Sequence, residues 1–243
     1  MIRRPNGNSR TVLSLYTGAG GLDLGLETAG FQPVLCVEVD EDAKRTLALN
    51  RPNWLLANPG DIHQVKPTTL LRMAGLKPRQ LTLLSGGPPC QPFSKSGYWS
   101  NGDALRLSDP RARTLHAYLD VVEVTLPQVL ILENVKGLAY NGKNEGLQLL
   151  QEGIKAINRK NRTAYVPRII TLNAVDYGVP QTRERVFVVA CIDGQEFVAP
   201  KPTHGDGSGL KPYLTAWDAI GEMDVSDWPD ELEPRGKWAG LLP

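Results

Sequence analysis

The sequence predicts an α/β fold built on a doubly wound, mostly parallel sheet, and three observations lead to this prediction. Short apolar or β-branched runs alternate with segments of helical period from Thr11 to about Ile192. Glycines and polar residues fall where the apolar runs end. With 243 residues, 41% of them hydrophobic and 22% charged, the chain is long enough to bury one substantial core.

The individual elements follow from the same alternation. Apolar and β-branched runs predict strands at 11–16, 33–39, 81–84, 128–133, 167–173 and 185–191. Helical periodicity between these runs predicts helices at 21–29, 41–49, 67–74, 112–125 and 144–159. Because ligands bind beyond the carboxyl ends of the strands in such a sheet, the residues that follow each strand are the first candidates for a site.

The regular alternation stops after Asp193, which divides the chain into two expected parts. We expect a core domain over 1–193 and an irregular segment over 194–243, in which only "TAWDAI" (215–220) reads as a helix. This segment is too apolar for a disordered tail and too irregular for an independent domain. We expect its tryptophans to be partly exposed unless a partner covers them: Trp217, Trp228 and Trp238.

Composition narrows the class of protein. No apolar run approaches the length of a membrane span, and three widely spaced cysteines favour a reducing, cytoplasmic setting. The net charge of +1 gives no general attraction to nucleic acid, so contacts with a polyanion would come from "RRPNGNSR", "DPRAR" and "QTRER". The three histidines are scattered, and no Cys or His pair stands at ligand spacing, so we predict no metal site.

A glycine-rich turn follows the first strand, in "YTGAGGLDLGLE". Gly18, Gly20 and Gly21 predict a tight turn at the start of a helix, where free backbone N–H groups can meet a ligand. A dinucleotide fingerprint has a third glycine where this chain has Asp23, and a carboxylate in the first helical turn repels a pyrophosphate. The turn therefore favours a ligand without phosphate, with an ordinary strand-to-helix turn as the alternative.

Two acids extend this pattern along the chain. The second strand ends in "VEVD", which offers Glu38 to a ribose diol, and "GDIH" offers Asp61 to an exocyclic amine. A glycine turn, a ribose acid and an adenine acid in this order suggest S-adenosyl-L-methionine as the ligand. The same candidate pocket includes residues that flank the three features: Tyr16, Ala19, Val39, Ile62 and Pro89.

One cysteine stands apart from the other two. Cys36 and Cys191 lie in apolar strands, as small hydrophobic residues do, whereas Cys90 lies in "SGGPPCQPFS". The neighbouring prolines hold this loop at little entropic cost, and a thiolate presented beside the candidate pocket is a nucleophile. An incidental loop cysteine is the alternative.

Charged residues mark two further strand ends. Glu133 follows the apolar run "QVLIL", which suits a carboxyl that shares or donates a proton, although it could instead cap the next helix. Arg183 and Arg185 stand two apart as the last strand begins, so both guanidinium groups would share one face. They could hold a carboxylate, a phosphate or a carbonyl oxygen, or form a solvated edge pair.

In chain order, "YTGAGG", "VEVD", "GDI", "GGPPCQPFS", "ILENV" and "QTRERVFVVA" resemble the motifs of the DNA cytosine-5 methyltransferases. The resemblance runs from about residue 11 to 191, with a weaker echo in "PTHG" and "TAWDAI". It implies a Rossmann-like sheet of the S-adenosylmethionine-dependent methyltransferase type. It also implies that 1–193 is the catalytic domain and binds this cofactor.

The resemblance further implies a role for each catalytic candidate. Cys90 would add to C6 of cytosine while Glu133 hydrogen-bonds or protonates N3, so that C5 can take the methyl group. Arg185 would contact the cytosine O2 and Arg183 would support the site or a phosphate, although these two roles could be exchanged. The target base would be flipped out of the duplex, and the polar segment 95–113 would close over it.

The resemblance stops short of the whole family pattern. Family members continue into a target-recognition domain and a returning helix that completes the cofactor pocket, whereas this sequence ends at Pro243. We expect either a fragment or the catalytic subunit of a split restriction-modification enzyme. Its partners would be DNA and a second polypeptide that carries that domain and helix, with no membrane. The alternatives are an RNA cytosine-5 methyltransferase fragment and a non-catalytic, cofactor-binding assembly subunit.

Overall fold

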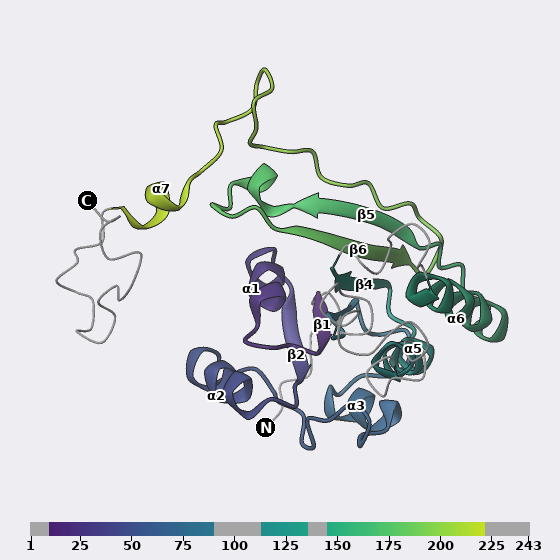
Figure 1. Ribbon diagram of the computed structural model, residues 1–243. Coiled ribbons are helices and arrows are strands. Elements are labelled where there is room, and N and C mark those ends of the chain that lie inside the picture. Colours follow the sequence, from purple (N-terminus) through teal and green to yellow (C-terminus); the bar gives the residue numbers. More distant parts are fainter. Residues whose placement is uncertain (1–9, 90–112, 136–144, 222–243) are drawn as a thin grey trace. The chain divides into compact units, whose positions relative to one another are not determined.

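The computed structural model describes residues 10–89, 113–135 and 145–221 (Figure 1). Their strands are β1 Thr11–Leu15, β2 Gln32–Val37, β3 Leu83–Gly86, β4 Val129–Asn134, β5 Arg168–Asn173 and β6 Glu184–Cys191. Their helices are α1 Gly21–Thr28, α2 Glu41–Asn50, α3 Pro67–Met73, α5 Arg113–Thr125, α6 Glu145–Asn161 and α7 Ala216–Ile220, with a 3₁₀ turn, η4, at Ala174–Tyr177.

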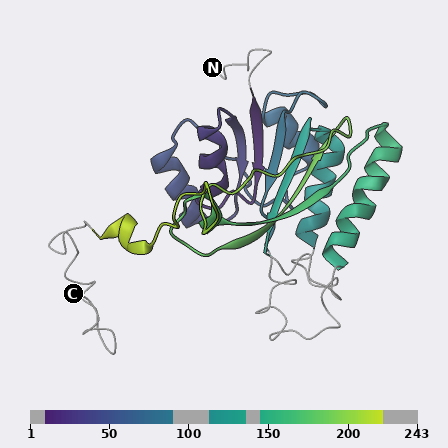
Figure 2. The same ribbon diagram turned by 90° about the horizontal axis from the view of Figure 1, so that it is seen from above.

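The six strands form one sheet in the order β2-β1-β3-β4-β6-β5. β1 pairs in parallel with β2 and β3, and β3 pairs in parallel with β4, which gives the predicted Rossmann-like arrangement. Figure 2 shows the strands of the sheet from above. The residues of β1 and β3 are buried throughout, as expected for inner strands of a parallel sheet. The carboxyl ends of β1, β2, β3 and β4 therefore lie at one edge of the sheet.

The pairing of β4 with β6 is antiparallel, and this direction matters for the site. β6 runs against β4, so Glu133 stands opposite Phe187 and Asn134 stands opposite Val186. In an antiparallel pair, one strand begins at the edge of the sheet where the other strand ends. The amino end of β6 therefore reaches the same edge as the carboxyl end of β4.

Helices cover the sheet through regularly spaced apolar residues. In α6, the buried side chains of Leu150, Ile154 and Ile157 recur at a spacing of three or four residues. α5 packs between α3 and α6 (Figure 1). A Cβ on Gly153 would lie 2.5 Å from Cδ1 of Leu119, so only glycine allows α5 and α6 to approach this closely.

The chain divides into two compact units. The first comprises Met1–Leu172 with Glu184–Ala199, and the second comprises Asn173–Arg183 with Pro200–Pro243. In the second unit, the backbone N–H groups of Thr203 and His204 both donate to the carbonyl of Asp176. A capping box between Thr215 and Asp218 starts α7. Among the helices of the described ranges, none has the length and apolar character needed to cross a membrane.

The predicted elements agree with the observed ones to within one or two residues at each end, and β3 differs most. We predicted 81–84, whereas the strand covers Leu83–Gly86. Ser85 and Gly86 continue the strand because each pairs with both neighbours, β1 and β4. Cross-strand pairing therefore extends β3 into a sequence whose glycine and serine would favour a loop.

Candidate active site

A pocket lies beyond the carboxyl ends of β1 and β2 in the first unit. Six of the predicted cofactor residues line it: Tyr16, Glu38, Val39, Asp61, Ile62 and Pro89. Four further residues complete its described lining: Val37, Gly60, His63 and Thr114. Gly18, Ala19, Gly20 and Gly21 form the adjoining turn and are not part of that lining.

Glu38 ties the glycine turn to the end of β2. Its Oε2 accepts a hydrogen bond of 2.6 Å from the backbone N–H of Gly18. Its Oε1 accepts bonds of 2.8 Å from the N–H groups of Val39 and Asp40. Three backbone donors therefore fix the carboxylate, and the remaining lone pairs can still accept from a diol in the pocket.

The turn itself has an open side and a packed side. Gly18 has a φ of +56°. Among the described residues, no atom beyond the adjacent backbone lies within 4 Å of the Cβ position of Gly18 or Gly21, so a ligand can approach the backbone there. Gly20 has a φ of +89°, and its Cβ position lies 2.9 Å from Cδ2 of Leu47 and 3.3 Å from the ring of Trp54. The packed side of the turn therefore requires glycine at position 20.

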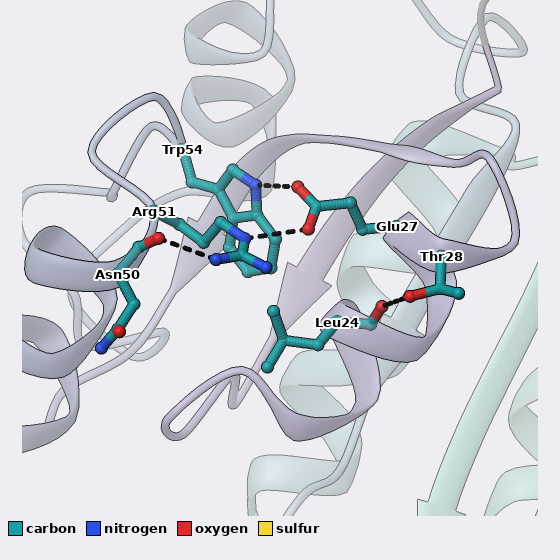
Figure 3. Close-up of polar contacts among 6 residues, drawn as sticks. All are labelled: Leu24, Glu27, Thr28, Asn50, Arg51 and Trp54. Atoms are coloured by element: carbon teal, nitrogen blue, oxygen red, sulfur yellow. Dashed lines mark hydrogen bonds and ion pairs between the residues drawn. The ribbon is translucent and has the colours of Figure 1, made fainter.

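A polar cluster holds Trp54 against the turn (Figure 3). Glu27, in the last turn of α1, accepts a 3.1 Å bond from Nε1 of Trp54 and a 2.8 Å bond from Nε of Arg51. The Arg51 guanidinium also lies 5.8 Å from the centre of the Trp54 ring. These contacts connect α1 with the segment that follows α2, beside the glycine turn.

Asp61 is held by the residues that follow it. Its carboxylate accepts a 2.9 Å bond from the N–H of His63 and a 2.8 Å bond from Nε2 of Gln64. The bond from His63 is the main reason that the pKa of Asp61 is lowered. A Cβ on Gly60 would lie 1.9 Å from the carbonyl oxygen of Glu38, so glycine is needed to bring the two acids to one pocket.

Tyr16 adopts a backbone conformation that is uncommon for a tyrosine. Its φ is +56°, in the left-handed region, and its hydroxyl donates a 2.6 Å bond to the carbonyl of Thr114 in α5. Burial, with the charge of Asp61, raises the pKa of this hydroxyl above its ordinary value. The residue therefore acts as a neutral donor and packs as an apolar wall of the pocket.

Asp23 differs from the role inferred for it in the sequence. We expected its carboxylate, in the first turn of the helix, to repel a pyrophosphate at the glycine turn. Instead it points into the core, with 1% of the residue exposed, and accepts bonds from Ser14 and Ser85. The first turn of a helix has an outer and an inner side, and the sequence alone did not show which side Asp23 takes.

The predicted general acid and one predicted arginine form an ion pair. Nε of Arg185 lies 2.9 Å from Oε1 of Glu133, and the two side chains are 23% and 28% exposed, so a substrate can still reach them. The antiparallel β6 explains this meeting, because Arg185 begins the strand where β4 ends.

The start of the cysteine loop lies beside this ion pair. Oε2 of Glu133 is 3.4 Å from the Cβ position of Gly87, and Nδ2 of Asn134 donates a 3.1 Å bond to the carbonyl of Pro88. Cys90 and most of the segment 95–113 lie outside the described residues. Only the anchor of the loop, up to Pro89, can be placed relative to Glu133.

Arg183 takes a different place from Arg185. It belongs to the second unit, where its N–H donates a 2.9 Å bond to Oδ1 of Asn173 and its carbonyl accepts a bond from the N–H of Ala174. Arg183 is exposed and precedes β6. Its expected role in the site therefore stays a prediction.

Sequence reasoning missed several residues of the pocket wall. Gly60 and His63 lie in the same short loop as Asp61. Their proximity to this predicted site residue in the sequence could have pointed to them. Thr114 gave no signal, because it comes from α5, 98 residues after Tyr16. Within the described ranges, no group of three or more His, Cys, Asp or Glu side chains is arranged to hold a metal ion.

The pocket has the features that S-adenosylmethionine requires. Two carboxylates, Glu38 and Asp61, face an otherwise largely apolar lining, and the open side of the glycine turn adjoins it. Such a lining suits a ligand with a diol, an amine and a positive charge, and it does not suit a pyrophosphate. The residues present therefore fit this methyl donor.

Comparison of this chain with known proteins identifies its family. The family of C-5 cytosine-specific DNA methylases matches residues 10–226. The chain is 36% identical over 238 residues to the Type II methyltransferase M.AquIA of Picosynechococcus sp., covering 93% of this chain and 94% of that protein. It is 38% identical over 209 residues to the Type II methyltransferase M.SacI of Streptomyces achromogenes, covering 81% of this chain and 52% of that protein.

Solved structures show the same fold. A prophage-encoded protein of E. coli, described as a DNA modification methyltransferase, superposes with a TM-score of 0.68 at 24% identity, covering 87% of this chain and 54% of that one. Spodoptera frugiperda DNMT2 superposes with a TM-score of 0.58 at 23% identity, covering 85% of this chain and 55% of that one. The chain therefore spans about half the length of M.SacI and of these two proteins.

Proposed function

Because the chain belongs to the family of C-5 cytosine-specific DNA methylases, we propose that it transfers a methyl group from S-adenosylmethionine to C5 of a flipped cytosine in DNA. One observation carries the proposal. The Glu133–Arg185 pair stands at the sheet edge, beside the start of the loop that leads to Cys90. An acid, a guanidinium and a thiol are the groups that addition to a cytosine ring requires.

The proposed chemistry begins with the thiolate of Cys90, which forms a bond to C6 of the cytosine. The ring nitrogen N3 accepts a hydrogen bond or a proton from Glu133, so that electron density moves to C5. C5 would then take the methyl group from the sulfonium of S-adenosylmethionine, and the donor sulfur would be left as a neutral thioether. A base then removes the C5 proton, the Cys90 sulfur leaves C6 as the thiolate, a proton taken up by N3 returns to Glu133, and the aromatic ring is restored.

The ion pair supports separate roles for its two members. The guanidinium of Arg185 keeps the Glu133 carboxyl oriented at the edge of the sheet, and its remaining N–H groups can donate to the cytosine O2. We assign Arg183 a supporting role or a phosphate contact. This proposal keeps the expected catalytic set of Cys90, Glu133, Arg183 and Arg185.

The donor would bind against Glu38 and Asp61 in the pocket lined by Tyr16, Ile62 and Pro89. Glu38 would accept from the ribose hydroxyls and Asp61 from the exocyclic amine of the adenine. Pro89 supports a connection between the donor pocket and the nucleophile, because it lines that pocket and directly precedes Cys90.

We further propose that this chain works with a second polypeptide that carries the recognition domain and the returning helix. The relative M.AquIA is matched over 94% of its own length, whereas M.SacI is matched over 52%. A methyltransferase polypeptide of this size therefore has a precedent among the relatives. On this basis 1–193 is the catalytic domain, and 194–243 leads toward the partner.

The product identifies the reaction. The chain, with and without a candidate partner polypeptide, is incubated with DNA and methyl-labelled S-adenosylmethionine, and the DNA is digested to nucleosides. We expect the label in 5-methylcytosine only, and none from the Cys90→Ser variant. Label in N4-methylcytosine or N6-methyladenine, or label in RNA rather than DNA, would contradict the proposed function.

A further inference from the structure

Asp23 is a carboxylate in the core of the first unit, and the proposed chemistry does not use it. It stands in the first turn of α1 with 1% of the residue exposed. Burial raises the pKa of its carboxyl to about 6, against the opposing effect of hydrogen bonds from Ser14 and Ser85. Near neutral pH the chain therefore keeps a largely ionised group in its core, which is unfavourable without a specific use.

The two oxygens of Asp23 connect two neighbouring strands. Oδ2 accepts a 2.8 Å bond from Oγ of Ser14 in β1, and Oδ1 accepts a 3.3 Å bond from Oγ of Ser85 in β3. The two serines are register partners in the parallel sheet, and both are buried. One carboxylate therefore holds the two strands just before they end at the site.

The Ser14 side leads to the cofactor turn. Oγ1 of Thr17 donates a 3.1 Å bond to Oγ of Ser14, and the carbonyl of Thr17 accepts a 3.0 Å bond from the N–H of Gly20. Thr17 also binds the end of β2, since its N–H donates to the carbonyl of Val37. The position of the turn thus depends on a chain of hydroxyl groups that ends at Asp23.

The Ser85 side leads to the start of the cysteine loop. Ser85 is followed by Gly86 and by Gly87, whose Cβ position is 3.4 Å from Oε2 of Glu133. The sequence then continues through Pro88 and Pro89 to Cys90. A shift of Ser85 would move the anchor of this loop relative to Glu133.

The surroundings of Asp23 point to positioning rather than to charge pairing. Its interactions with described residues include no basic side chain. The titratable group that faces it from β2 is Cys36, whose thiol pKa is raised to about 12, mainly by burial and also by the Asp23 charge. The side-chain donors to this buried carboxylate are the two serine hydroxyls, so it serves to hold those hydroxyls.

We propose that Asp23 is a positioning residue that fixes the cofactor turn and the anchor of the Cys90 loop relative to each other. It acts through Ser14 on the donor site and through Ser85 on the nucleophile. The inference rests on the proposed function, because it assigns the two sides to a methyl donor and a thiol.

The two serines allow the two sides to be tested separately. We expect Ser14→Ala to weaken S-adenosylmethionine binding about fivefold with little change in kcat, since it breaks the link to the turn. We expect Ser85→Ala to lower kcat about fivefold with little change in donor affinity. Asp23→Asn, which keeps the shape but replaces one acceptor oxygen with a donor, should show both losses.

Donor affinity is measured by calorimetry on the full chain, and kcat is measured in the preparation that methylates DNA. Thr125→Val is the matched control, because it removes a buried hydroxyl that bonds within α5, away from the site. It should leave both quantities within twofold of wild type. If no preparation methylates DNA detectably, the proposed function is contradicted. The S-adenosylmethionine affinities of the Asp23→Asn and Ser14→Ala variants, compared with wild type, would still test the role of Asp23.

Two results would overturn the inference. One is an Asp23→Asn variant with the donor affinity and kcat of wild type. The other is that Ser14→Ala and Ser85→Ala each lose donor affinity and kcat to the same extent. General destabilisation of the fold would produce that result. If Asp23→Asn does not fold, the contrast between Ser14→Ala and Ser85→Ala still decides the question.

Discussion

Carboxylates occupy three different settings in this molecule, and each setting predicts a different behaviour. Glu38 and Asp61 accept bonds from backbone N–H groups and line the proposed donor pocket. Asp23 accepts from two buried hydroxyls. Glu133 pairs with Arg185. Glu38 and Asp61 are anchored and available to a ligand, Asp23 is enclosed, and Glu133 is held beside the proposed substrate position.

The donor acids give the first prediction. Asp61→Ala should weaken S-adenosylmethionine binding about tenfold, which corresponds to about 1.4 kcal/mol for a hydrogen bond to a charged group. Glu38→Ala should weaken it at least as much, because it also releases the N–H of Gly18 from its 2.6 Å bond. Calorimetry measures both, with Glu41→Ala as control, since that exposed acid pairs with Lys44 at the start of α2. Unchanged affinity in both variants would place the donor elsewhere.

The second prediction concerns the pH dependence of stability. Burial raises the pKa of Asp23 from 3.8 to about 6, so the native state binds more protons than the unfolded state between these values. The contribution of Asp23 to stability is therefore largest in acid and falls as pH rises to about 6. The Asp23→Asn variant has no titrating group at this position, so its stability does not fall in this way. The free energy of unfolding of the variant minus that of wild type should therefore rise by about 2 kcal/mol from pH 4.5 to pH 7.5.

Denaturant unfolding at the two pH values checks this prediction. A difference between Asp23→Asn and wild type that does not change with pH would show that Asp23 titrates in the folded protein as it does in the unfolded chain.

The sequence predicted residues that line the pocket beyond β1 and β2 better than it predicted the surroundings of Asp23. Glu38 and Asp61 follow directly after strand ends or beside a glycine, where side chains gather at one edge of a sheet. Asp23 lies inside a helical turn, and its direction depends on Ser14 and Ser85 from two other strands. Such a contact has no local pattern.

At the scale of elements, α1 and the segment after α2 are joined by the Glu27, Arg51 and Trp54 cluster (Figure 3). Trp54 is 8% exposed, and its ring packs against the Gly20 side of the cofactor turn. The cluster therefore stabilises the packed side of the glycine turn as well as the packing of α1.

The third prediction follows from this cluster. Glu27→Ala leaves the buried indole N–H of Trp54 without its acceptor, so it should lower the free energy of unfolding by about 1–3 kcal/mol. Glu27→Gln keeps an acceptor oxygen and should lose less. Urea unfolding followed by circular dichroism measures both, and Glu41→Ala should stay within about 0.5 kcal/mol of wild type. A Glu27→Ala variant as stable as Glu41→Ala would contradict a structural role for the cluster.

Element bounds followed closely from periodicity, whereas strand direction did not. The apolar run of β6 is the same whether the strand is parallel or antiparallel. Only the observed pairing with β4 explains why Arg185 meets Glu133, since a parallel β6 would begin at the opposite edge. The two residues were predicted separately as site candidates, and their direct contact was not.

At the scale of the whole molecule, the second unit exposes large apolar side chains. Trp217 is 65% exposed and Ile220 is 54% exposed, and the preceding Tyr213 and Leu214 are also exposed. The expectation of partial exposure is confirmed for Trp217, whereas Trp228 and Trp238 lie outside the described residues. Exposed aromatic and aliphatic side chains of this kind are typical of surfaces that bind a protein partner.

The fourth prediction is that the chain alone methylates DNA negligibly. Its net charge of +1 supplies little counterion-release affinity for a polyanion. Adding a polypeptide with the recognition region should restore sequence-specific transfer, and Trp217→Ala should weaken that restoration without changing donor affinity. Incorporation of labelled methyl groups at micromolar protein measures both. Robust, site-specific transfer by the isolated chain would contradict the need for a partner.

The central claim is that Cys90 attacks the cytosine, and trapping of the covalent intermediate tests it most directly. A DNA duplex with 5-fluorocytosine at the target position cannot lose its C5 substituent, so the enzyme should remain bonded to C6 after methyl transfer. We expect a denaturation-resistant adduct that requires S-adenosylmethionine, with the modified peptide mapping to Cys90, and no adduct from Cys90→Ser. An adduct that persists in Cys90→Ser, or that maps to another residue, would contradict the account.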